Sequence, residues 1–372
     1  MKILHLVGTL NNGGIERIVS QLALTQKREY GHQPLIGCVL RKEGVYLKAL
    51  LNENIPVYDL SYTSKNPLVL TRKLISLLET ENPDLIHSHV NFSLLFQAIP
   101  RYFHPIPFVL TQHSFSAQSK TLPFKTRAYI SYKILQRKPF QHTTVSQLAA
   151  EYVTSVYPTS INQIVVIHNG INADDFRFNA EHRRRIREQW NVSNDEIVIG
   201  CVGRLDYVKG YDILLEAFDH VSQMLPSTPL RLVIAGKGEQ MEALVNQNKQ
   251  YQNAHRVQWL GRIDNVPEAL SAFDLYAQAS RWETMSVAIA EALANGLNVV
   301  TTKKTGIAEF NSFSDRLFIS PNLDPLVFAQ TLENAVIKNG KNENRITSFP
   351  QELLILNMVK KYDDIYRQFQ TQ

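Results

Sequence analysis

The sequence predicts an α/β protein made of two doubly wound domains, and three observations support this fold class. Short apolar runs of the length of buried parallel strands alternate with longer amphipathic segments along most of the chain. This alternation stops near Asn169-Gly170 and a charged stretch over 174–190, and it begins again at Glu196. A chain of 372 residues is also too long for one ordinary core. We therefore predict two domains of similar size that face each other across a cleft.

The first alternation begins with a strand over 2–7, a turn that contains Gly8, Gly13 and Gly14, and an amphipathic helix over 15–28. Further strands are predicted at 34–40, 56–60, 84–89, 108–112, 141–146 and 164–168. Helices are predicted at 45–52, 67–80, 92–102 and from 147 onward. A basic, aromatic segment over 120–140 interrupts the pattern. A parallel sheet with helices on both faces follows from this order.

The second alternation supplies the other domain. Strands are predicted at 197–202, 230–235, 257–260, 275–278 and 297–301, and a single amphipathic helix at 352–369 closes the chain. We place the N-terminal domain at 1–172 together with a C-terminal helix at 355–372, and the second domain at 173–354. Ligands of such sheets bind at the carboxyl ends of the strands.

The composition limits the class of protein. Hydrophobic residues make up 44% of the chain and charged residues 20%, as in soluble globular proteins. Cys38 and Cys201 both lie in apolar, strand-like runs, which indicates reduced core cysteines. The N-terminal apolar run is too short for a signal peptide, and no apolar stretch approaches membrane-spanning length. We expect a cytoplasmic protein that touches membranes only from outside.

The net charge of +5 is unevenly distributed along the chain. Residues 1–170 hold 17 Lys and Arg against 9 Asp and Glu, or +8, and the remainder holds 22 against 25, or −3. No acidic residue occurs from 85 to 150. A one-sided positive field favours an anionic partner, such as lipid headgroups, a phosphorylated acceptor or nucleic acid.

Two acidic residues stand out in the second half. Glu283 and Glu291 bracket seven uncharged residues, and Asn295-Gly296 has the form of a helix end. Glu283 is therefore expected just before a helix, and Glu291 about two turns into it, on a helix that is apolar on nearly every side. A buried carboxylate needs a partner. The hydroxyl groups of a ligand, or a distant base, would supply it.

Two cations follow the first strand of the second domain, in the segment Gly203-Arg204-Leu205-Asp206-Tyr207-Val208-Lys209-Gly210. Arg204 and Lys209 would leave the sheet at its carboxyl edge beside a helix start, where they suit a diphosphate. Taken alone, the segment is equally consistent with a surface turn in which Lys209 is solvated.

The order of these motifs resembles the family-4 retaining glycosyltransferases of the GT-B fold, of the type that builds bacterial cell-surface polysaccharides. The resemblance covers essentially the whole chain. It is carried by the segment around Arg204 and Lys209, by Gly236-Lys-Gly238-Glu, by Leu260-Gly261-Arg262, by the two glutamates, and by 12–16, 84–89, 111–113, 167–171 and 358–362. It implies two Rossmann-like domains with a C-terminal helix that returns to the N-terminal domain.

The resemblance also implies a role for each matching residue. Arg204 and Lys209 would hold the nucleotide diphosphate, together with Gly14 and the backbone N–H groups of Met285, Ser286 and Val287. Glu283 and Thr284 would hold the donor sugar, and Glu291 the ribose. The backbone of Gly261, Arg262 and Ile263 would read the base, and His113 would lie beside the anomeric carbon. The predicted catalytic set is therefore His113, Glu283, Arg204 and Lys209.

The chain departs from the family pattern at one point. Family members usually continue Glu-Gly-Phe-Gly-Leu, whereas this chain has Glu283-Thr284-Met285-Ser286-Val287. The loss of both glycines restricts the backbone where it meets the donor sugar. The identity of the sugar is therefore expected to be read here.

Several other signals have simpler interpretations. Gly236-Lys-Gly238 lacks the third glycine of a dinucleotide fingerprint, so NAD is not expected. His87-Ser88-His89 could hold a metal, but no third ligand is spaced for it, and no Asp-x-Asp pair occurs. We expect no metal and no cofactor. The six cations of 120–138 fit either a helix that lies on an anionic bilayer or a solvated face over a core helix. No recognised motif supports nucleic-acid binding.

The predicted function is metal-independent transfer of a hexose or N-acetylhexosamine, with retention of configuration, from a nucleotide diphosphate. UDP is favoured over GDP. The acceptor would be a hydroxyl of a glycan or of a lipid-linked, phosphorylated saccharide at the inner face of the plasma membrane. Two alternatives share the fold: a nucleotide-sugar epimerase, in which His113 is the strong acid–base candidate, and a non-catalytic subunit that binds nucleotide sugar.

Overall fold

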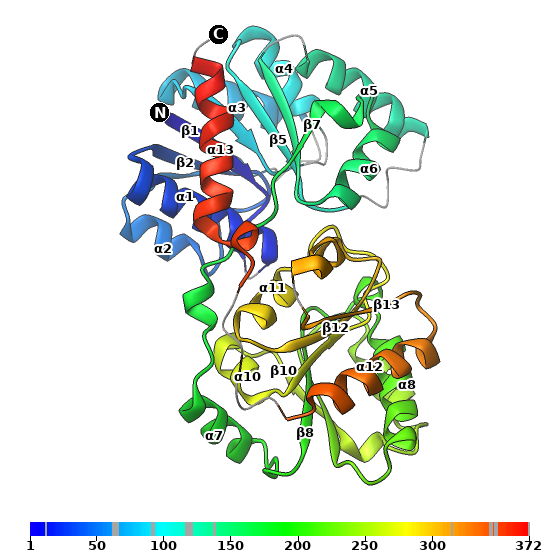
Figure 1. The fold of residues 1–372 in the computed structure, drawn as a ribbon. Helices are drawn as coiled ribbons and strands as arrows, with labels where there is room; N and C mark the ends of the chain where they lie inside the picture. The colour runs from blue at the N-terminus through cyan, green and yellow to red at the C-terminus, as the bar shows by residue number, and fades with distance from the viewer. Residues whose placement is uncertain are drawn as a thin grey trace. The chain divides into compact units, whose positions relative to one another are not determined.

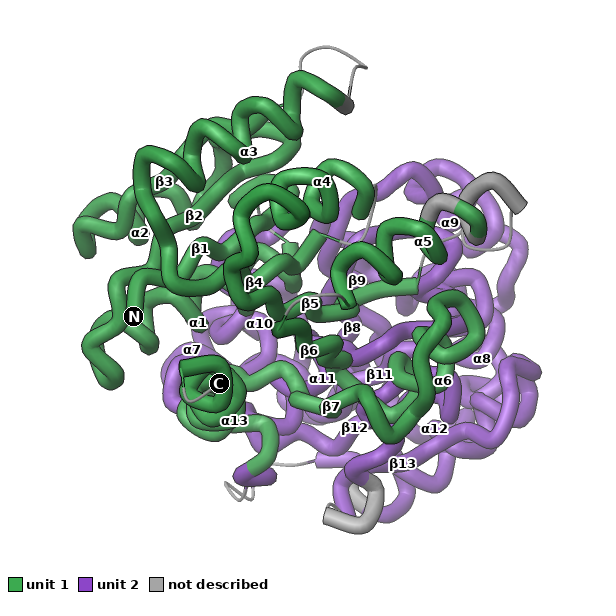
Figure 2. The backbone as a smooth tube through the Cα atoms, turned by 90° about the horizontal axis from the view of Figure 1, so that it is seen from above, with its two compact units in different colours: residues 1–171, 352–372 green, residues 172–351 purple. Residues whose placement is uncertain are grey.

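In a computed structural model the chain forms two compact units, Met1–Ile171 with Glu352–Gln372 (unit 1) and Asn172–Gln351 (unit 2) (Figure 2). The predicted domain boundaries lie one residue and three residues from these limits. The structure describes residues 1–11, 13–61, 67–90, 94–115, 122–136, 139–313, 315–341, 345 and 349–370.

Unit 1 is organised around one parallel sheet with the strand order β3-β2-β1-β4-β5-β6-β7 (Figure 1). The strands are β1 (Lys2–Val7), β2 (Gln33–Cys38), β3 (Val57–Asp59), β4 (Leu85–Ser88), β5 (Phe108–Gln112), β6 (Phe140–Thr144) and β7 (Ile164–Val166). The helices are α1 (Gly14–Tyr30), α2 (Leu47–Asn52), α3 (Pro67–Glu81), α4 (Leu95–Phe103), α5 (Leu122–Leu135), α6 (Gln147–Val156) and α13 (Ile355–Gln370). The chain runs outward from β1 in one direction and returns to β4 on its other side, so the strand order reverses between β1 and β4.

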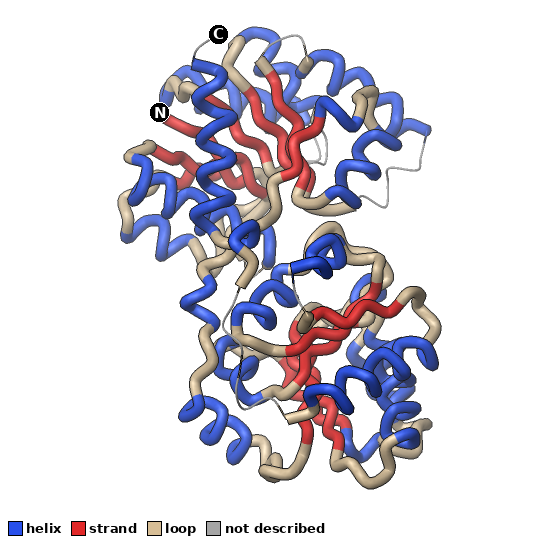
Figure 3. The backbone as a smooth tube through the Cα atoms, in the orientation of Figure 1, coloured by secondary structure: helices blue, strands red, loops and turns tan. Residues whose placement is uncertain are grey.

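Unit 2 repeats this plan with the strand order β10-β9-β8-β11-β12-β13. Its strands are β8 (Ile197–Val202), β9 (Leu230–Ala235), β10 (Val257–Gly261), β11 (Leu275–Gln278), β12 (Asn298–Thr302) and β13 (Leu317–Ser320). Its α-helices are α7 (Ala180–Gln189), α8 (Tyr211–Met224), α9 (Met241–Asn248), α10 (Val266–Ala272), α11 (Val287–Ala294) and α12 (Pro325–Asn339). Helices flank the sheet of each unit (Figure 3), which confirms the predicted fold class.

The strands are buried because both faces of each sheet are covered. All residues of β5, β11 and β12 are buried, and the cores are rich in Leu, Ile and Val from strands and the inner faces of helices. Such continuous apolar strands are typical of parallel sheets between helical layers. Cys38 and Cys201 are buried and free, as the sequence predicts.

The last helix, α13, belongs to unit 1 and packs against α1. Its polar contacts are specific: Gln26 Nε2 donates to Tyr366 Oη at 3.2 Å, and His32 Nε2 lies 2.8 Å from Asp363 Oδ1. The predicted return of the C-terminal helix to the N-terminal domain is therefore confirmed. Within the described residues, no helix combines the length and the apolar character that a membrane crossing requires.

The charged stretch at 174–190, which the sequence suggests is a linker with a connecting helix, is anchored in unit 2. Arg183 and Arg187 of α7 bind the fully buried carboxylate of Asp274, at 2.6 Å and 2.9 Å. Asp274 Oδ2 also accepts from the backbone N–H of Val198 at 2.8 Å. Two cations and a backbone donor thus compensate a buried charge, which would be costly alone. Part of the charge pattern is internal and does not mark a solvated linker.

Candidate active site

The strand order of unit 2 reverses between β8 and β11, so the loops that follow these two strands diverge at the carboxyl edge of the sheet. Such a switch point is where open α/β sheets bind ligands. A backbone hydrogen bond ties these two loops together, from Arg281 N–H to Val208 O at 2.8 Å. Two others join the ends of β8, β9 and β10: Gly203 N–H donates to Ala235 O at 3.0 Å, and Gly236 N–H donates to Gly261 O at 2.7 Å. The edge is therefore a preformed rim.

Glycine is required in this rim for close approach. Gly210 has φ +64°, and a Cβ there would lie 2.0 Å from the carbonyl oxygen of Ala279, just after β11. A Cβ on Gly238 would lie 2.1 Å from the carbonyl oxygen of Leu205. A larger residue at either position would push the loops apart, because these neighbours are backbone atoms.

Lys209 and Glu283 form an ion pair across the switch point. Lys209 ends the short 3₁₀ helix η4 (Tyr207–Lys209) after β8, and its Nζ lies 2.5 Å from Oε1 of Glu283, after β11. Both side chains are more than four-fifths buried, with 18% and 17% exposed. The pair holds a cation and an anion side by side at the one edge where a ligand would bind.

The other carboxylate oxygen of Glu283 is also fixed. Gln278 Nε2 donates to Oε2 at 2.6 Å, and Ser280 Oγ donates to the same atom at 3.3 Å. Gln278 also contacts Ser286 Oγ, at 3.1 Å from its Nε2. Glu283 is thus held by three side chains, which pre-organises it for a ligand.

Arg204 is arranged differently from Lys209. Its side chain is 78% exposed, and its Nε donates to Asp206 Oδ2 at 2.6 Å. Asp206 Oδ1 accepts from the backbone N–H of Lys209 at 3.2 Å. One carboxylate therefore orients the guanidinium and caps the turn that carries the lysine. Arg204 remains accessible to a ligand.

The start of helix α11 lies at the same edge. Ser286 is its N-cap, and its Oγ accepts from Ile289 N–H at 3.4 Å. Thr284, Met285 and Ser286 are buried, and Val287 is the first helical residue. The helix dipole favours an anion before this terminus. Glu291 lies in the second turn and is 4% exposed, so the predicted burial of this carboxylate is confirmed.

The segment Gly261–Ile263 begins at the last residue of β10, which lies two strands away from β8. Gly261 has φ +67°, in the left-handed region that favours glycine, and its carbonyl is held by Gly236 N–H. Arg262 is exposed and its Nε lies 3.7 Å from Asp264 Oδ1. The loop that begins at Gly236, after β9, therefore helps to fix the backbone of the Gly261–Ile263 segment.

The predicted sugar, ribose and base residues and the predicted diphosphate residues other than Gly14 thus all lie in unit 2, at the end of β10 or in segments that follow β8, β10 and β11. Three further side chains contribute that the sequence analysis does not single out: Asp206, Gln278 and Ser280. Asp206 lies within the Gly-Arg-Leu-Asp segment, and Gln278 is a polar residue that ends an apolar strand. Polar residues at the ends of buried strands were the signal that could have identified Gln278.

The two remaining predicted residues lie in unit 1. Gly14 begins helix α1 after β1 and is exposed. His113 follows β5, is 6% exposed, and its Nε2 lies 2.9 Å from Nδ1 of His89. Burial lowers the pKa of His113 to about 3, so its ring is neutral at physiological pH.

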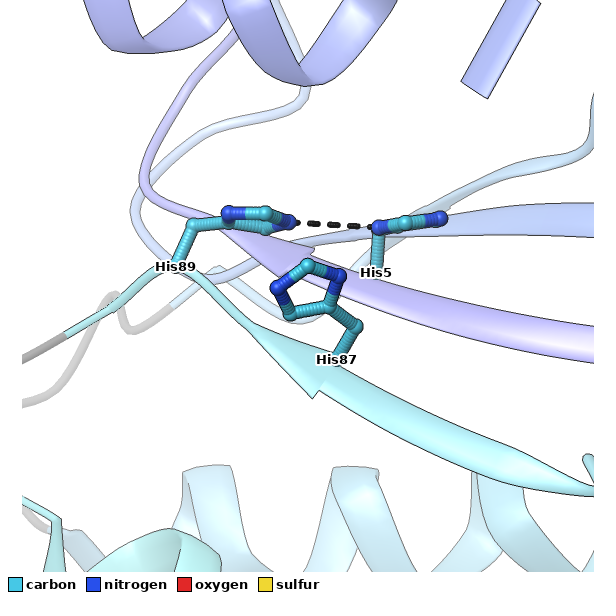
Figure 4. A group of neighbouring side chains, drawn as sticks. All are labelled: His5, His87 and His89. Atoms are coloured by element: carbon cyan, nitrogen blue, oxygen red, sulfur yellow. Dashed lines mark hydrogen bonds between the residues drawn. The ribbon is translucent and has the colours of Figure 1, made fainter. Parts of the chain in front are cut away.

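The expectation that His87 and His89 lack a third histidine is wrong. His5 of β1 is paired in register with His87 of β4, and the three buried rings lie together (Figure 4). One ligand atom from each lies within 4.8 Å of the others. Sequence spacing could not reveal this cluster, because 82 positions separate His5 from His87 and the two strands meet only in the sheet.

The two parallel-sheet units define the class of two-domain, doubly wound α/β proteins, and comparisons with known proteins identify the family. The Glycosyltransferase Family 4 domain matches residues 12–175, and the Glycosyl transferases group 1 domain matches residues 182–349. Together the two matched regions cover most of both units. The chain belongs to the family-4 glycosyltransferases of the GT-B fold, and it is therefore an enzyme of the transferase class.

Individual proteins are similar over long regions. An uncharacterized glycosyltransferase of Methanocaldococcus jannaschii is 29% identical over 250 residues, 64% of this chain but only 62% of that relative. A human phosphatidylinositol N-acetylglucosaminyltransferase protein is 26% identical over 368 residues, 95% of this chain and 70% of that relative. A crystal structure of Anabaena Alr3699/HepE in complex with UDP-glucose superposes with a TM-score of 0.83 and 22% identity, covering 100% of both chains. This last similarity shows the fold.

Proposed function

We propose that the enzyme transfers a hexose or N-acetylhexosamine from a UDP-sugar to a hydroxyl of a lipid-linked saccharide, with retention of the anomeric configuration. The observation that carries this proposal is the Lys209–Glu283 pair at the switch point of unit 2. A cation for phosphate and an anion for sugar hydroxyls stand side by side there, as the two halves of a sugar diphosphate require. The UDP-glucose complex of the Anabaena protein of the same fold supports a UDP-sugar donor.

The diphosphate would bind between three positive features. Lys209 offers an ammonium, Arg204 offers an exposed guanidinium, and the start of helix α11 offers backbone N–H groups at Met285–Val287. The negative charge that develops on the leaving phosphate would be stabilised by these fixed groups. Gly14, with its exposed helix start in unit 1, would contact the diphosphate as the family resemblance implies.

The rest of the donor would be held by the remaining residues of the edge. Glu283, already fixed by Gln278 and Ser280, would accept hydrogen bonds from sugar hydroxyls, with Thr284 beside it. The buried carboxylate of Glu291 would accept from the ribose hydroxyls, and the Gly261–Ile263 backbone would read uracil. In Thr284-Met285-Ser286 this chain differs from the family, so these residues would decide which sugar is accepted.

The chemistry needs no further co-reactant. The acceptor oxygen would attack the anomeric carbon on the face from which the diphosphate leaves. The bond between that carbon and the phosphate oxygen breaks, its electron pair stays on UDP, and the acceptor proton passes to the departing phosphate. With the leaving group stabilised by Arg204, Lys209 and the helix terminus, we propose that this transfer is independent of metal ions.

We also propose that unit 1 docks on an anionic membrane through helices α4 and α5, which pack against each other. Tyr102 and Phe103 at the end of α4 and Tyr129 and Ile130 on α5 are each at least half exposed, next to exposed Lys133. No acidic residue occurs between 85 and 150 to oppose anionic lipid. Tyr132 and Leu135 are buried instead, so the described side chains of α5 divide into a buried side and an exposed side. The name of the human relative, a phosphatidylinositol N-acetylglucosaminyltransferase subunit, supports a lipid acceptor.

The proposal is tested by incubating the protein with a panel of UDP- and GDP-sugars, with and without lipid-linked saccharides, and following free nucleotide diphosphate. We expect release that depends on both a UDP-sugar and an acceptor, with the product glycoside in the donor's configuration. Conversion of the nucleotide sugar without acceptor would indicate an epimerase. Binding without turnover for any pair would indicate a non-catalytic subunit.

A further inference from the structure

A continuous chain of buried side-chain hydrogen bonds runs through unit 1 from the carbonyl of Leu110 to His113. The first links join strands β5, β6 and β4: Thr143 Oγ1 to Leu110 O at 3.4 Å, Thr111 Oγ1 to Thr143 Oγ1 at 2.7 Å, and His87 Nε2 to Thr111 Oγ1 at 2.7 Å. The next links pass through the helices α13 and α1: Tyr366 Oη to His87 Nδ1 at 2.6 Å, Gln26 Nε2 to Tyr366 Oη at 3.2 Å, and His5 Nε2 to Gln26 Oε1 at 2.8 Å. The last links join the histidines: His89 Nε2 to His5 Nδ1 at 3.2 Å, and His113 Nε2 to His89 Nδ1 at 2.9 Å. Figure 4 shows the His5–His89 link and the ring of His87 beside it.

The direction of this chain is fixed at one end, because a backbone carbonyl can only accept. Thr143 has one hydroxyl hydrogen and uses it for Leu110 O, so it must accept from Thr111. Thr111 likewise has one hydrogen and must accept from His87 Nε2. The hydroxyl of Tyr362 lies 3.1 Å from the same oxygen and takes its second acceptor position.

The same assignment of donors and acceptors continues through the histidines, which burial keeps neutral by lowering their pKa values. With its proton on Nε2, His87 accepts at Nδ1 from the Tyr366 hydroxyl, which then accepts from Gln26 Nε2. The carbonyl of Gln26 therefore faces His5, which donates from Nε2 and accepts at Nδ1 from His89. His89 in turn accepts from His113 Nε2–H.

We propose that this chain fixes His113 in the tautomer that carries its proton on Nε2, so that Nδ1 is always an acceptor, and that Thr143, Tyr366 and Gln26 are positioning residues for it. The family resemblance implies that His113 lies beside the anomeric carbon, so the inference rests on the proposed function for its catalytic meaning. An acceptor nitrogen there would orient a hydroxyl of the donor sugar. Because Tyr366 lies on α13, the last helix of the sequence takes part in the hydrogen-bond chain that orients His113.

The chain also explains why the three clustered histidines do not need a metal ion. Each ring nitrogen of His5, His87 and His89 has a hydrogen-bond partner within the described residues. A metal bound to them would displace at least the His5–His89 link, which is the one that transmits the direction to His113. Metal binding by these histidines and the hydrogen-bond chain to His113 therefore exclude each other.

The test compares two adjacent threonines of β6 that are both fully buried. Thr143→Val removes the hydroxyl that sets the direction, whereas Thr144→Val removes a hydroxyl that donates to Ser146 O at 3.1 Å, outside the chain. Long-range proton–nitrogen correlation spectra of histidine-labelled protein report which ring nitrogen of His113 is protonated, with a His113→Asn variant for assignment. We expect the Nε2–H tautomer in the unchanged protein and in Thr144→Val, and both tautomers in Thr143→Val and in Tyr366→Phe.

Turnover supplies the second readout. We expect Thr143→Val to lower kcat about tenfold with the donor KM nearly unchanged, as the loss of one aligned hydrogen bond predicts, and Thr144→Val to have no such effect. A proton on Nδ1 of His113 in the unchanged protein, equal effects of the two valine variants, or one zinc ion retained per chain through His5 and His89 would each overturn the inference. The tautomer of His113 is measured without substrate, so the hydrogen-bond chain can be confirmed even if the proposed transferase reaction is not.

Discussion

The ammonium nitrogen of Lys209 lies 2.5 Å from Oε1 of Glu283. The two residues follow β8 and β11, the neighbouring strands between which the strand order of unit 2 reverses. These residues are 74 positions apart, and the loop geometry brings them together without help from local sequence. Lys209 has three donor hydrogens, so it can keep Glu283 and still bind a phosphate oxygen. In the proposed donor site, the pair would link diphosphate binding to sugar binding.

Glu283→Gln is expected to separate these two roles. The amide keeps the size of the side chain but loses the charge that accepts from sugar hydroxyls, so we expect the transfer rate to fall by about a hundredfold. Affinity for UDP without a sugar should change by only a few fold. Initial rates and calorimetric UDP titrations measure the two quantities. A comparable loss in both would show that Glu283 does not act through the sugar.

Glu291 is expected to recognise ribose hydroxyls. The unchanged protein should bind UDP about tenfold more tightly than 2′-deoxy-UDP, because the deoxy ligand forms one hydrogen bond fewer with a carboxylate that binding removes from water. In Glu291→Ala both ligands should bind weakly and equally. Competitive displacement of a labelled UDP-sugar gives the four affinities, and an undiminished preference for UDP in the variant would refute the assignment.

The exposed face of α4 and α5 is expected to bind membranes. Replacing Tyr129 and Ile130 with Ser, together with Lys133→Glu, should abolish flotation with vesicles that contain anionic lipid, since it removes both the apolar and the positive parts of the surface. Ile337→Ser is the matched control, because Ile337 is 68% exposed on α12 of unit 2. Equal flotation of the two variants would remove α5 from the docking surface.

Acid is expected to unfold unit 1 before unit 2. Burial lowers the pKa of six histidines in unit 1: to about 4 for His5, to about 3 for His113 and His142, well below 6.5 for His87 and His89, and below 6.5 for His32. Their unfolded pKa is near 6.5, so the unfolded chain binds more protons below that pH. The stability that these neutral rings contribute is complete above pH 6.5 and is lost progressively as the pH falls toward 4.

The two units can be followed separately in one experiment. All three tryptophans, Trp190, Trp259 and Trp282, lie in unit 2, so their fluorescence reports that unit, whereas far-ultraviolet circular dichroism reports both. Between pH 7 and pH 4 we expect part of the dichroism to be lost before the fluorescence changes. Coincident transitions would show that burial of these histidines does not control acid stability.

Much of the fold was predictable because buried parallel strands are short apolar runs. Strands β5, β8, β9 and β11 begin and end at the predicted residues. The strand β13 was not anticipated, since Leu317–Ser320 is short and is flanked by polar residues, without the longer apolar context that β11 has. The positions of the donor-site residues followed from motif order, because strand ends at one edge of a parallel sheet converge whatever the loops between them.

The rest depends on contacts between distant strands and helices, which a single sequence does not encode locally. His5 meets His87 only because β1 and β4 are neighbours, and Tyr366 reaches both His87 and Gln26 only because α13 returns to α1. The charged stretch at 174–190 is typical of a linker and connecting helix, but two charges of α7 pair with Asp274, 87 to 91 positions away. These partners became visible only in three dimensions.

The most direct test of the account is a calorimetric titration of UDP into the unchanged protein, Lys209→Ala and Lys249→Ala. Lys249 is an exposed cation of the same unit that contacts only Asn246 among its described polar partners, so it controls for the loss of charge. We predict that Lys209→Ala weakens UDP binding ten- to hundredfold, as the loss of a charge-assisted hydrogen bond implies, and that Lys249→Ala leaves it unchanged. Equal UDP affinity in all three proteins would contradict the claim that the switch-point pair holds a nucleotide diphosphate.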